Sequence, residues 1–208
     1  MIYLASASPR RHEILSGMGI AHTVLTVPAP PGEDEPRLPG EPPGDYVRRT
    51  ARDKALRAIQ FLSHDPQAPT PAPILAADTT VMLGDDILGK PADPADAARM
   101  LRRLSGTTHE VHSAIVLAPA PAILESSLDH GSALLEDVSV TQVRFAVLSD
   151  EQITAYCATG EPMGKAGGYG IQGAAATFIE HISGSYSGVM GLPIFETHRL
   201  LRQAALIP

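Results

Sequence analysis

A short polar segment near the start of the chain combines small side chains with two arginines. Residues 5–8 read Ala-Ser-Ala-Ser, and Pro9, Arg10 and Arg11 follow. Ser8 is typical of a helix N-cap and Pro9 of the first helical position, so free N–H groups of the first turn would point outward. A helix N-terminus with guanidiniums beside it attracts phosphate. The segment is equally consistent with an anion site and with a capped helix that carries two solvated arginines.

One carboxylate, Asp78, stands inside the apolar run 74–83, between Ala77 and Thr79. A carboxylate in a buried strand costs free energy unless it is paired or bound to a metal. We therefore expect Asp78 to be a metal ligand or a general base. The alternative is an aspartate at a strand end that only forms a turn.

Three lysines occupy unusual places in a chain that has few of them. Lys54 lies within an expected helix, Lys90 lies between Gly89 and Pro91, and Lys165 follows Gly164. Each lysine alone is typical of a solvated surface residue. Taken together with the two arginines, they predict a set of phosphate contacts.

An acidic group, residues 33–35, lies in a loop rich in proline and glycine. Its default interpretation is a solvated loop. Divalent metals such as Mg²⁺ are usually held by one or two carboxylates plus substrate phosphates, so this loop and Asp78 could also form a metal site. The pattern at 168–173 spells G-x-G-x-x-G, but the residues after it favour a strand, and we interpret it as a chance match.

Alternating apolar periodicity and turn residues indicate the elements that would position these groups. Ser149 and Gln152 form an expected capping box. Several strands follow one another in the second half, which favours an α/β protein with a mixed sheet. Strands are expected at 1–5, 22–27, 74–83, 109–117, 138–147 and 176–182, and helices at 9–18, 45–62, 94–104, 149–160 and after 193.

Composition limits the classes of function. The chain has 208 residues and a formal net charge of −7, which argues against binding a nucleic-acid polymer. Aromatic residues make up 4% and tryptophan is absent, so base-stacking platforms are not expected. A lone cysteine, Cys157, and the lack of a long apolar run or leader-like segment favour a cytoplasmic protein without a membrane span.

These pieces together resemble the Maf family of nucleoside triphosphate pyrophosphatases, in order over essentially the whole chain. One departure is Gly164, where many relatives have aspartate. The matching segments are 4–11 with 13–15, Asp34-Glu35, 51–55, 77–79, 88–91, 104–106 with His109, 165–173 and 191–193.

The resemblance implies a Maf/ITPase-like α/β fold. Its sheet would be mixed and strongly curved, flanked by helices, with two lobes around a central cleft and no clean linker. We expect one catalytic domain over residues 1–208. It also implies hydrolysis of a nucleoside triphosphate to the monophosphate and pyrophosphate with a divalent metal, Mg²⁺ or Mn²⁺. Relatives suggest a homodimer.

Three positions separate the branches of that family. Arg10, Thr79 and Gln172 match the branch that acts on dTTP and UTP. The family's proton acceptor corresponds to Asp78. We expect Asp78, Lys54 and Lys90 to be catalytic, and Glu35 and Asp78 to hold the metal. The expected substrate-binding residues are Ser8, Arg10, Arg11, Thr79, Lys165 and Gln172.

Two alternatives stay open at this point. The chain could be a pyrophosphatase that clears modified or damaged nucleotides, which a panel of base analogues would reveal. It could instead be a nucleotide-sensing regulator of septum formation and cell division with little turnover. Nucleotide binding without release of pyrophosphate would favour the regulator.

Overall fold

The computed structural model describes residues 1–28, 35–63, 71–120 and 134–208 and divides them into two compact units. Unit 1 comprises 1–78, 114–138 and 191–208, and unit 2 comprises 79–113 and 139–190. The boundary falls inside three strands, β3 (Ile74–Leu83), β5 (Thr108–Ala118) and β6 (Leu135–Phe145). Each unit is therefore assembled from segments that are distant in sequence.

A mixed sheet supports both units. Among the described residues it has seven strands, in the order β2-β1-β3-β5-β6-β7, with β4 paired to β3. β1 pairs with β2 and with β3 in parallel, whereas β3–β4 and β6–β7 are antiparallel. These pairings confirm the expectation of an α/β protein with a mixed sheet.

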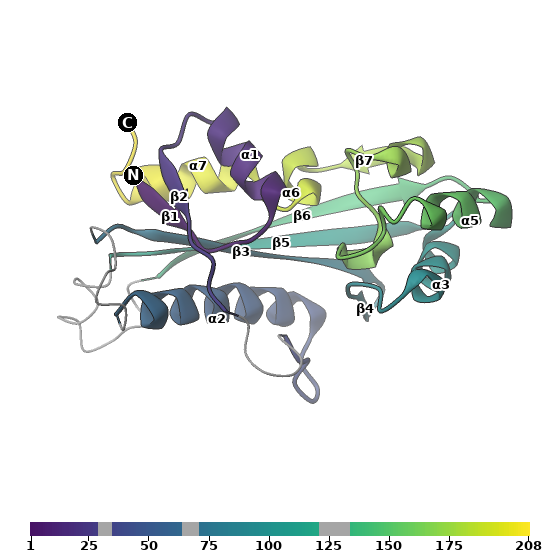
Figure 1. Cartoon of the computed structure of the whole chain (residues 1–208), viewed down its shortest axis with the longest axis horizontal. Coiled ribbons are helices and arrows are strands. Elements are labelled where there is room, and N and C mark those ends of the chain that lie inside the picture. Colours follow the sequence, from purple (N-terminus) through teal and green to yellow (C-terminus); the bar gives the residue numbers. More distant parts are fainter. Residues whose placement is uncertain (29–34, 64–70, 121–133) are drawn as a thin grey trace. The chain divides into compact units, whose positions relative to one another are not determined.

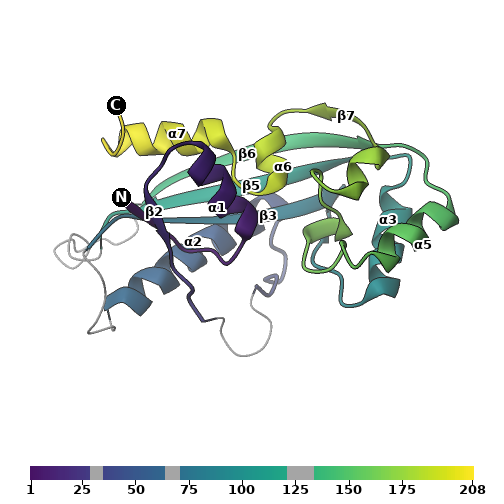
Figure 2. The same cartoon turned by 45° about the horizontal axis from the view of Figure 1, so that its top comes forward.

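Unit 1 places helices on both faces of its strands. In Figures 1 and 2, α1 and α7 lie on one face of the sheet and α2 lies on the other. The expected apolar stripe of α2 is buried, including Val47, Ala51 and Ala55, because these positions recur at helical spacing. The elements wholly in unit 1 are β1 (Ile2–Leu4), α1 (Pro9–Gly17), β2 (His22–Val24), α2 (Pro43–Ser63) and α7 (Ile194–Gln203).

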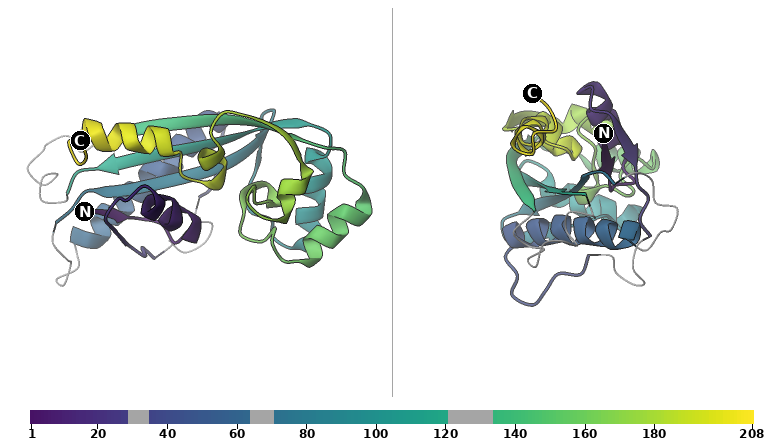
Figure 3. Two further views of the ribbon diagram at one scale, coloured as in Figure 1. Left: turned by 90° about the horizontal axis from the view of Figure 1, so that it is seen from above. Right: turned by 90° about the vertical axis from the view of Figure 1, so that its left-hand side faces the viewer.

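Unit 2 has its own core, in which aromatic rings pack edge to face. Phe145 contacts Tyr169, and Tyr156 contacts Phe178, at ring-centroid distances of 4.9 and 5.3 Å. Helices α3 and α5 lie side by side in this unit (Figure 3). The elements wholly in unit 2 are β4 (Asp86–Leu88), α3 (Pro94–Leu104), α5 (Asp150–Ala158), the 3₁₀ turns η1 (Ala166–Gly168) and η2 (Ala174–Phe178), β7 (Ile179–Ser183) and α6 (Tyr186–Met190).

Most expected elements occur within a few residues of their predicted bounds. The Ser149–Gln152 capping box is present at α5, and Asp93 caps α3. Two local features differ from the prediction: residues 174–178 form a 3₁₀ turn where a strand was expected from residue 176, and the short helix α6 was not predicted. The predictions on Glu33 and Asp34 lie outside the described residues.

Candidate functional site

Asp78 ends the part of β3 that belongs to unit 1, and its side chain is buried. Its Oδ1 accepts a hydrogen bond from Lys54 Nζ at 2.7 Å, and its Oδ2 accepts one from Thr50 Oγ1 at 2.7 Å. A buried carboxylate is tolerated when it is paired and hydrogen-bonded in this way. The structure thus brings Asp78 and Lys54 together, as a shared site requires.

Both donors come from one face of α2. Thr50 and Lys54 are four residues apart, so helical spacing places them one above the other. The sequence analysis named Lys54 but missed Thr50. The signal that could have identified Thr50 is its position on the otherwise apolar stripe of the helix, one turn before Lys54.

The ammonium of Lys54 also pairs with the carboxylate of Glu35. The hydroxyl of Tyr46, on α2, donates to the Glu35 carbonyl oxygen at 3.0 Å and ties that residue to the helix. Two carboxylates therefore share one cation within unit 1. This is the pair of residues that the sequence analysis expected to hold a metal.

The surroundings of Asp78 decide its protonation. Burial alone would raise the pKa of Asp78, but the charge and hydrogen bond of Lys54 oppose burial and hold that pKa below its ordinary value. Thr50 and Arg11 act in the same direction. The carboxylate is consequently ionised at neutral pH.

Arg11 is fixed by two contacts within unit 1. Its Nε donates to the Gly191 carbonyl at 2.7 Å, and its Nη1 donates to Ser6 Oγ at 3.1 Å. Burial lowers the pKa of Arg11. The negative charges of Asp78 and Glu35 act to raise this pKa, and the positive charge of Arg10 acts to lower it. A guanidinium stays charged in proteins, so Arg11 adds positive charge to the surroundings of Asp78.

The N-terminus of α1 has the expected layout. Ser8 occupies the N-cap position with extended backbone and Pro9 opens the helix, but the Ser8 side chain makes no capping bond. The Ser8 N–H donates to Ser6 Oγ at 3.2 Å. The Ser8 side chain thus leaves the first-turn N–H groups uncapped, as an anion site at this helix end requires.

The other predicted residues belong to unit 2. The loops that carry Lys90 and Lys165 are joined by a hydrogen bond from the Gly167 N–H to the Gly89 carbonyl at 3.0 Å. Lys90 and Gln172 are exposed, and the Lys165 ammonium donates to the Glu161 carbonyl. The Thr79 hydroxyl lies 2.8 Å from Ser113 Oγ.

The glycine-rich loop of unit 2 is shaped by Glu161. Its Oε2 accepts a hydrogen bond from the Ala174 N–H at 3.0 Å, and a Cβ at Gly173 would lie only 2.1 Å from its Oε1. The two 3₁₀ turns η1 and η2 flank residues 169–173, and no α-helix opens there. This confirms that the G-x-G-x-x-G pattern is not a dinucleotide fingerprint.

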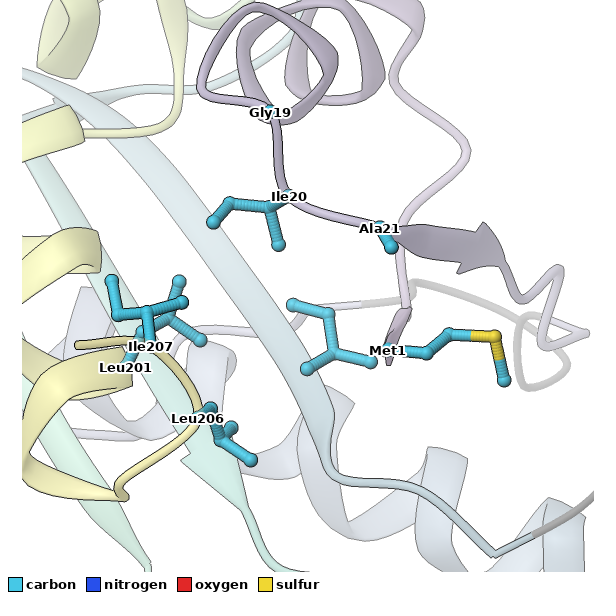
Figure 4. Close-up of a pocket in the computed structure, with 8 residues that line it drawn as sticks. Met1, Gly19, Ile20, Ala21, Leu201, Leu206 and Ile207 are labelled. Carbon is cyan, nitrogen blue, oxygen red and sulfur yellow. The ribbon is translucent and has the colours of Figure 1, made fainter.

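A hollow of about 180 Å³ lies elsewhere in unit 1 and is drawn in Figure 4. It contains none of the predicted site residues. Its lining comes from both ends of the chain and from the turn after α1: Met1, Ile2, Gly19, Ile20, Ala21, Leu201, Leu206 and Ile207. Within 1–28, 35–63, 71–120 and 134–208, no helix is long and apolar enough to cross a bilayer.

Comparisons with known proteins found relatives that match nearly the whole chain. A protein called dTTP/UTP pyrophosphatase from Bordetella pertussis is 58% identical over 205 residues, which cover 99% of this chain and 93% of that protein. Proteins of the same name from Ralstonia nicotianae and a Polaromonas species are 50% and 47% identical to this chain. Both alignments cover 99% of this chain, and they cover 94% and 96% of the two relatives.

A solved nucleoside-triphosphatase / dITP/XTP pyrophosphatase from Mycobacterium abscessus aligns with 100% of this chain and 97% of its own. Its TM-score is 0.41 at 17% identity, a similarity too low to support a conclusion. The model of one family, described as Maf-like protein, matches residues 1–204. With relatives of this identity over nearly its whole length, the chain belongs to the family of Maf-like proteins.

Proposed function

We propose that this chain hydrolyses dTTP and UTP to the nucleoside monophosphate and pyrophosphate. The observation that carries the proposal is the buried Asp78 carboxylate, which Lys54 keeps ionised beside Arg11. The relatives named dTTP/UTP pyrophosphatase support the choice of substrates. Lys54 and Arg11 lie near Asp78 although the net charge of the chain is −7. This local positive charge supports a ligand that carries several phosphates.

Phosphate would be bound by the cations of unit 1. Arg11 is clamped by Gly191 and Ser6 and so presents a guanidinium of fixed orientation. Arg10 stands at the N-terminus of α1, where the helix dipole favours an anion. Groups held in place before the substrate arrives lose little entropy on binding. Such positioning supplies a large part of the catalysis of phosphoryl transfer.

Asp78 would act on the attacking water. An ionised carboxylate accepts a hydrogen bond from water and orients its oxygen toward the α-phosphorus. The water oxygen bonds to the α-phosphorus, the bond from the α-phosphorus to the bridging oxygen breaks, pyrophosphate leaves with the electron pair of that bond, and the proton released by the water passes to solvent. Because the pKa of Asp78 is held low, the carboxylate is a weak base, and orientation of the water is its main contribution.

Glu35 and Asp78 are the residues that would hold a divalent metal. They fit it, because both carboxylates already face one ammonium group. Mg²⁺ usually takes only one or two carboxylates, with substrate phosphates and water completing its shell. The described part of the chain has no group of three or more metal-ligating side chains, which suits a metal that binds together with its substrate. When bound, Mg²⁺ or Mn²⁺ would neutralise phosphate charge.

For unit 2 we propose that Lys90 and Lys165 contact phosphate and that Thr79 and Gln172 contact the base. The joined lysine loops support the first assignment. An amide can donate and accept at once, which suits uracil and thymine. We further propose a single catalytic domain that forms a homodimer in the cytoplasm. Light scattering after size exclusion tests the dimer.

The decisive experiment measures release of pyrophosphate from dTTP, UTP, CTP and 7-methyl-GTP, with Mg²⁺, with Mn²⁺ and with a chelator. We expect turnover of dTTP and UTP that the chelator removes. Asp78→Asn should lower kcat at least about 100-fold while the circular dichroism spectrum stays unchanged. Nucleotide binding without release of pyrophosphate by the wild type would refute the proposal and favour a sensing role.

A further inference from the structure

Glu35 lies in a segment, residues 35–41, that forms neither helix nor strand. Its carboxylate nevertheless pairs with Lys54, the same cation that pairs with Asp78. No ladder of backbone hydrogen bonds fixes a segment of this kind, so the partners of its polar groups decide where it lies. The place of Glu35 therefore depends on the contacts that the 35–41 segment makes with α2.

Arg49, on α2, contacts the 35–41 segment near both of its ends. Its Nη2 donates to the carbonyl oxygen of Pro36, the residue after Glu35, at 2.9 Å. Its Nε and Nη2 donate to the two carboxylate oxygens of Glu41 at 2.6 and 2.9 Å, which is a bidentate pair. One guanidinium thus joins the segment to the helix from Pro36 to Glu41.

The guanidinium of Arg49 is itself held by α2. Its Nη1 donates to Asp53 Oδ2 at 3.1 Å, and its Cζ lies 5.6 Å from the centroid of the Tyr46 ring. Spacings of three and four residues place Tyr46, Arg49 and Asp53 on one face of the helix. The Tyr46 hydroxyl donates to the Glu35 carbonyl oxygen, so two successive carbonyls of the segment, those of Glu35 and Pro36, are bound by this face.

Glu41 makes the far end of the segment a closed turn. Its N–H donates to the Leu38 carbonyl at 3.1 Å, and its carboxylate accepts from the Leu38 N–H at 3.2 Å. Its carbonyl accepts two hydrogen bonds from the Arg37 guanidinium, at 3.1 and 2.9 Å. The contact between Arg49 and Glu41 therefore fixes the whole turn and not one side chain alone.

These contacts require an arginine. The planar guanidinium has five N–H donors in a fixed fork, and Arg49 makes four hydrogen bonds to residues that the structure describes. Lysine would keep the positive charge, but its single nitrogen cannot bind Pro36, Asp53 and both Glu41 oxygens together. Arg49→Lys thus removes the fork and leaves the charge.

We propose that Arg49 is a positioning residue that holds Glu35 where it serves as a metal ligand. The proposal rests on the proposed function, in which Glu35 and Asp78 hold a divalent metal, and it adds the residue that sets the place of Glu35. In this role Arg49 acts through the backbone of the 35–41 segment. If the segment is released, Glu35 is in place in fewer molecules, and the apparent affinity for metal falls by that fraction.

The first test measures release of pyrophosphate from UTP as a function of Mn²⁺ concentration. Arg49→Lys should raise the Mn²⁺ concentration for half-maximal activity about tenfold, which corresponds to Glu35 in place in about a tenth of the molecules. The kcat at saturating Mn²⁺ should stay unchanged. Arg48→Lys, at the exposed neighbouring position of α2, is the matched control and should change neither value. An unchanged Mn²⁺ requirement in folded Arg49→Lys would overturn the proposal.

A double-mutant cycle separates positioning from a general loss of structure. In a Glu35→Gln background, Arg49→Lys should raise the Mn²⁺ requirement no further, because the ligand that it positions is gone. The same tenfold effect in both backgrounds would contradict the proposal. A Mn²⁺ requirement that Glu35→Gln leaves unchanged would contradict both the metal assignment to Glu35 and the role of Arg49.

A further measurement needs no turnover. Electron paramagnetic resonance counts the Mn²⁺ bound to protein mixed with UMP, which has no phosphoanhydride to hydrolyse. Binding should be about tenfold weaker in Arg49→Lys than in the wild type and in Arg48→Lys. This result in a protein that releases no pyrophosphate would contradict only the proposed reaction. Equal Mn²⁺ binding by all three proteins would contradict the role of Arg49.

Discussion

At the scale of single residues, the Asp78 carboxylate depends on two donors that α2 supplies. Thr50 Oγ1 also lies 3.1 Å from the Val47 carbonyl, but its one proton is better used at the charged partner, 2.7 Å away. Without Thr50, one carboxylate oxygen would lose its hydrogen bond in a buried place. Stability and charge at Asp78 are therefore linked through Thr50.

Replacing Thr50 with valine should lower the free energy of unfolding by about 2 kcal/mol, the usual range for a hydrogen bond to a charged group. Valine has nearly the same shape, so packing is preserved. Urea unfolding monitored by circular dichroism gives the value. Thr50→Ser, which keeps the hydroxyl, should lose much less, and equal losses in the two variants would show that the hydrogen bond is not the cause.

His109 is a second residue with a measurable consequence. It is buried, its Nε2 lies 2.8 Å from the Tyr169 hydroxyl, and its Nδ1 has no hydrogen-bond partner among the described residues. Burial lowers the pKa of His109 from 6.5 to about 4. The folded protein therefore keeps this ring neutral at pH values where the unfolded chain protonates it.

The sign of the pH effect follows from this difference. Between pH 6.5 and about 4 the unfolded state binds the extra proton, so stability falls as the pH falls through that window. The loss attributable to His109 approaches about 3 kcal/mol at the acid end. Unfolding curves for wild type and His109→Gln, taken across the window, measure it. Parallel pH profiles for the two proteins would contradict the assignment.

Single residues also show what the sequence can and cannot predict. Asp78 and Lys54 could be predicted because a charge in an apolar run and a lysine inside a motif are recognisable in the sequence alone. Ser113 and Ser6 gave no such signal, since a serine can bond to almost any polar group. Their roles come from partners far away in the sequence, Gly188 and Arg11.

At the scale of elements, the loop between α5 and β7 uses glycines for two different reasons. Gly164 and Gly167 both have left-handed backbone, with φ of 72° and 68°. A Cβ at Gly164 would meet nothing within 4 Å, whereas a Cβ at Gly167 would lie 2.9 Å from Val81 Cγ2. Gly167 thus lets this loop approach β3 closely within unit 2.

Alanine at these two positions should separate backbone strain from crowding. Gly164→Ala should cost about 1 kcal/mol, the penalty of a left-handed conformation for an L-residue. Gly167→Ala should cost about 3 kcal/mol, because overpacking adds to the same penalty. Guanidinium unfolding of both variants gives the comparison. If the two variants lose equal stability, the contact with Val81 is not restrictive.

Elements with strong local signals were predictable, and those with weak signals were not. Apolar periodicity located α2, and turn residues with a capping box located α5. The start of β7 was predicted too early because Ala176 to Phe178 have strand-like composition but form a 3₁₀ turn. The start of α6 was missed because serine and glycine, its second and third residues, are typical of turns.

At the scale of the whole molecule, three strands begin in one unit and end in the other. Each unit is built from several separate segments of the chain, so neither unit can be cut out as one segment. The sequence predicted the mixed sheet, because alternating and consecutive strands are both visible in it. The division inside strands was beyond prediction, since it depends on long-range contacts. The strong curvature and central cleft implied by the family resemblance stay predictions.

Because β3, β5 and β6 each contribute residues to both units, we expect one cooperative unfolding transition. The chain has no tryptophan, so Phe61→Trp in unit 1 and Phe178→Trp in unit 2 each supply a single fluorescent probe. Both probes should report the same midpoint in urea, and the calorimetric and van't Hoff enthalpies should agree. Two separated midpoints would show that the units unfold independently.

The hollow of unit 1 is lined by Met1 and by Ile207, so residues near both ends of the described chain lie at one place. A linker could join these ends beside the hollow. New ends could then be opened at the exposed turn of Gly84 and Asp85, which makes this protein suited to circular permutation. For the same reason, an affinity tag at either end would be anchored beside the same hollow.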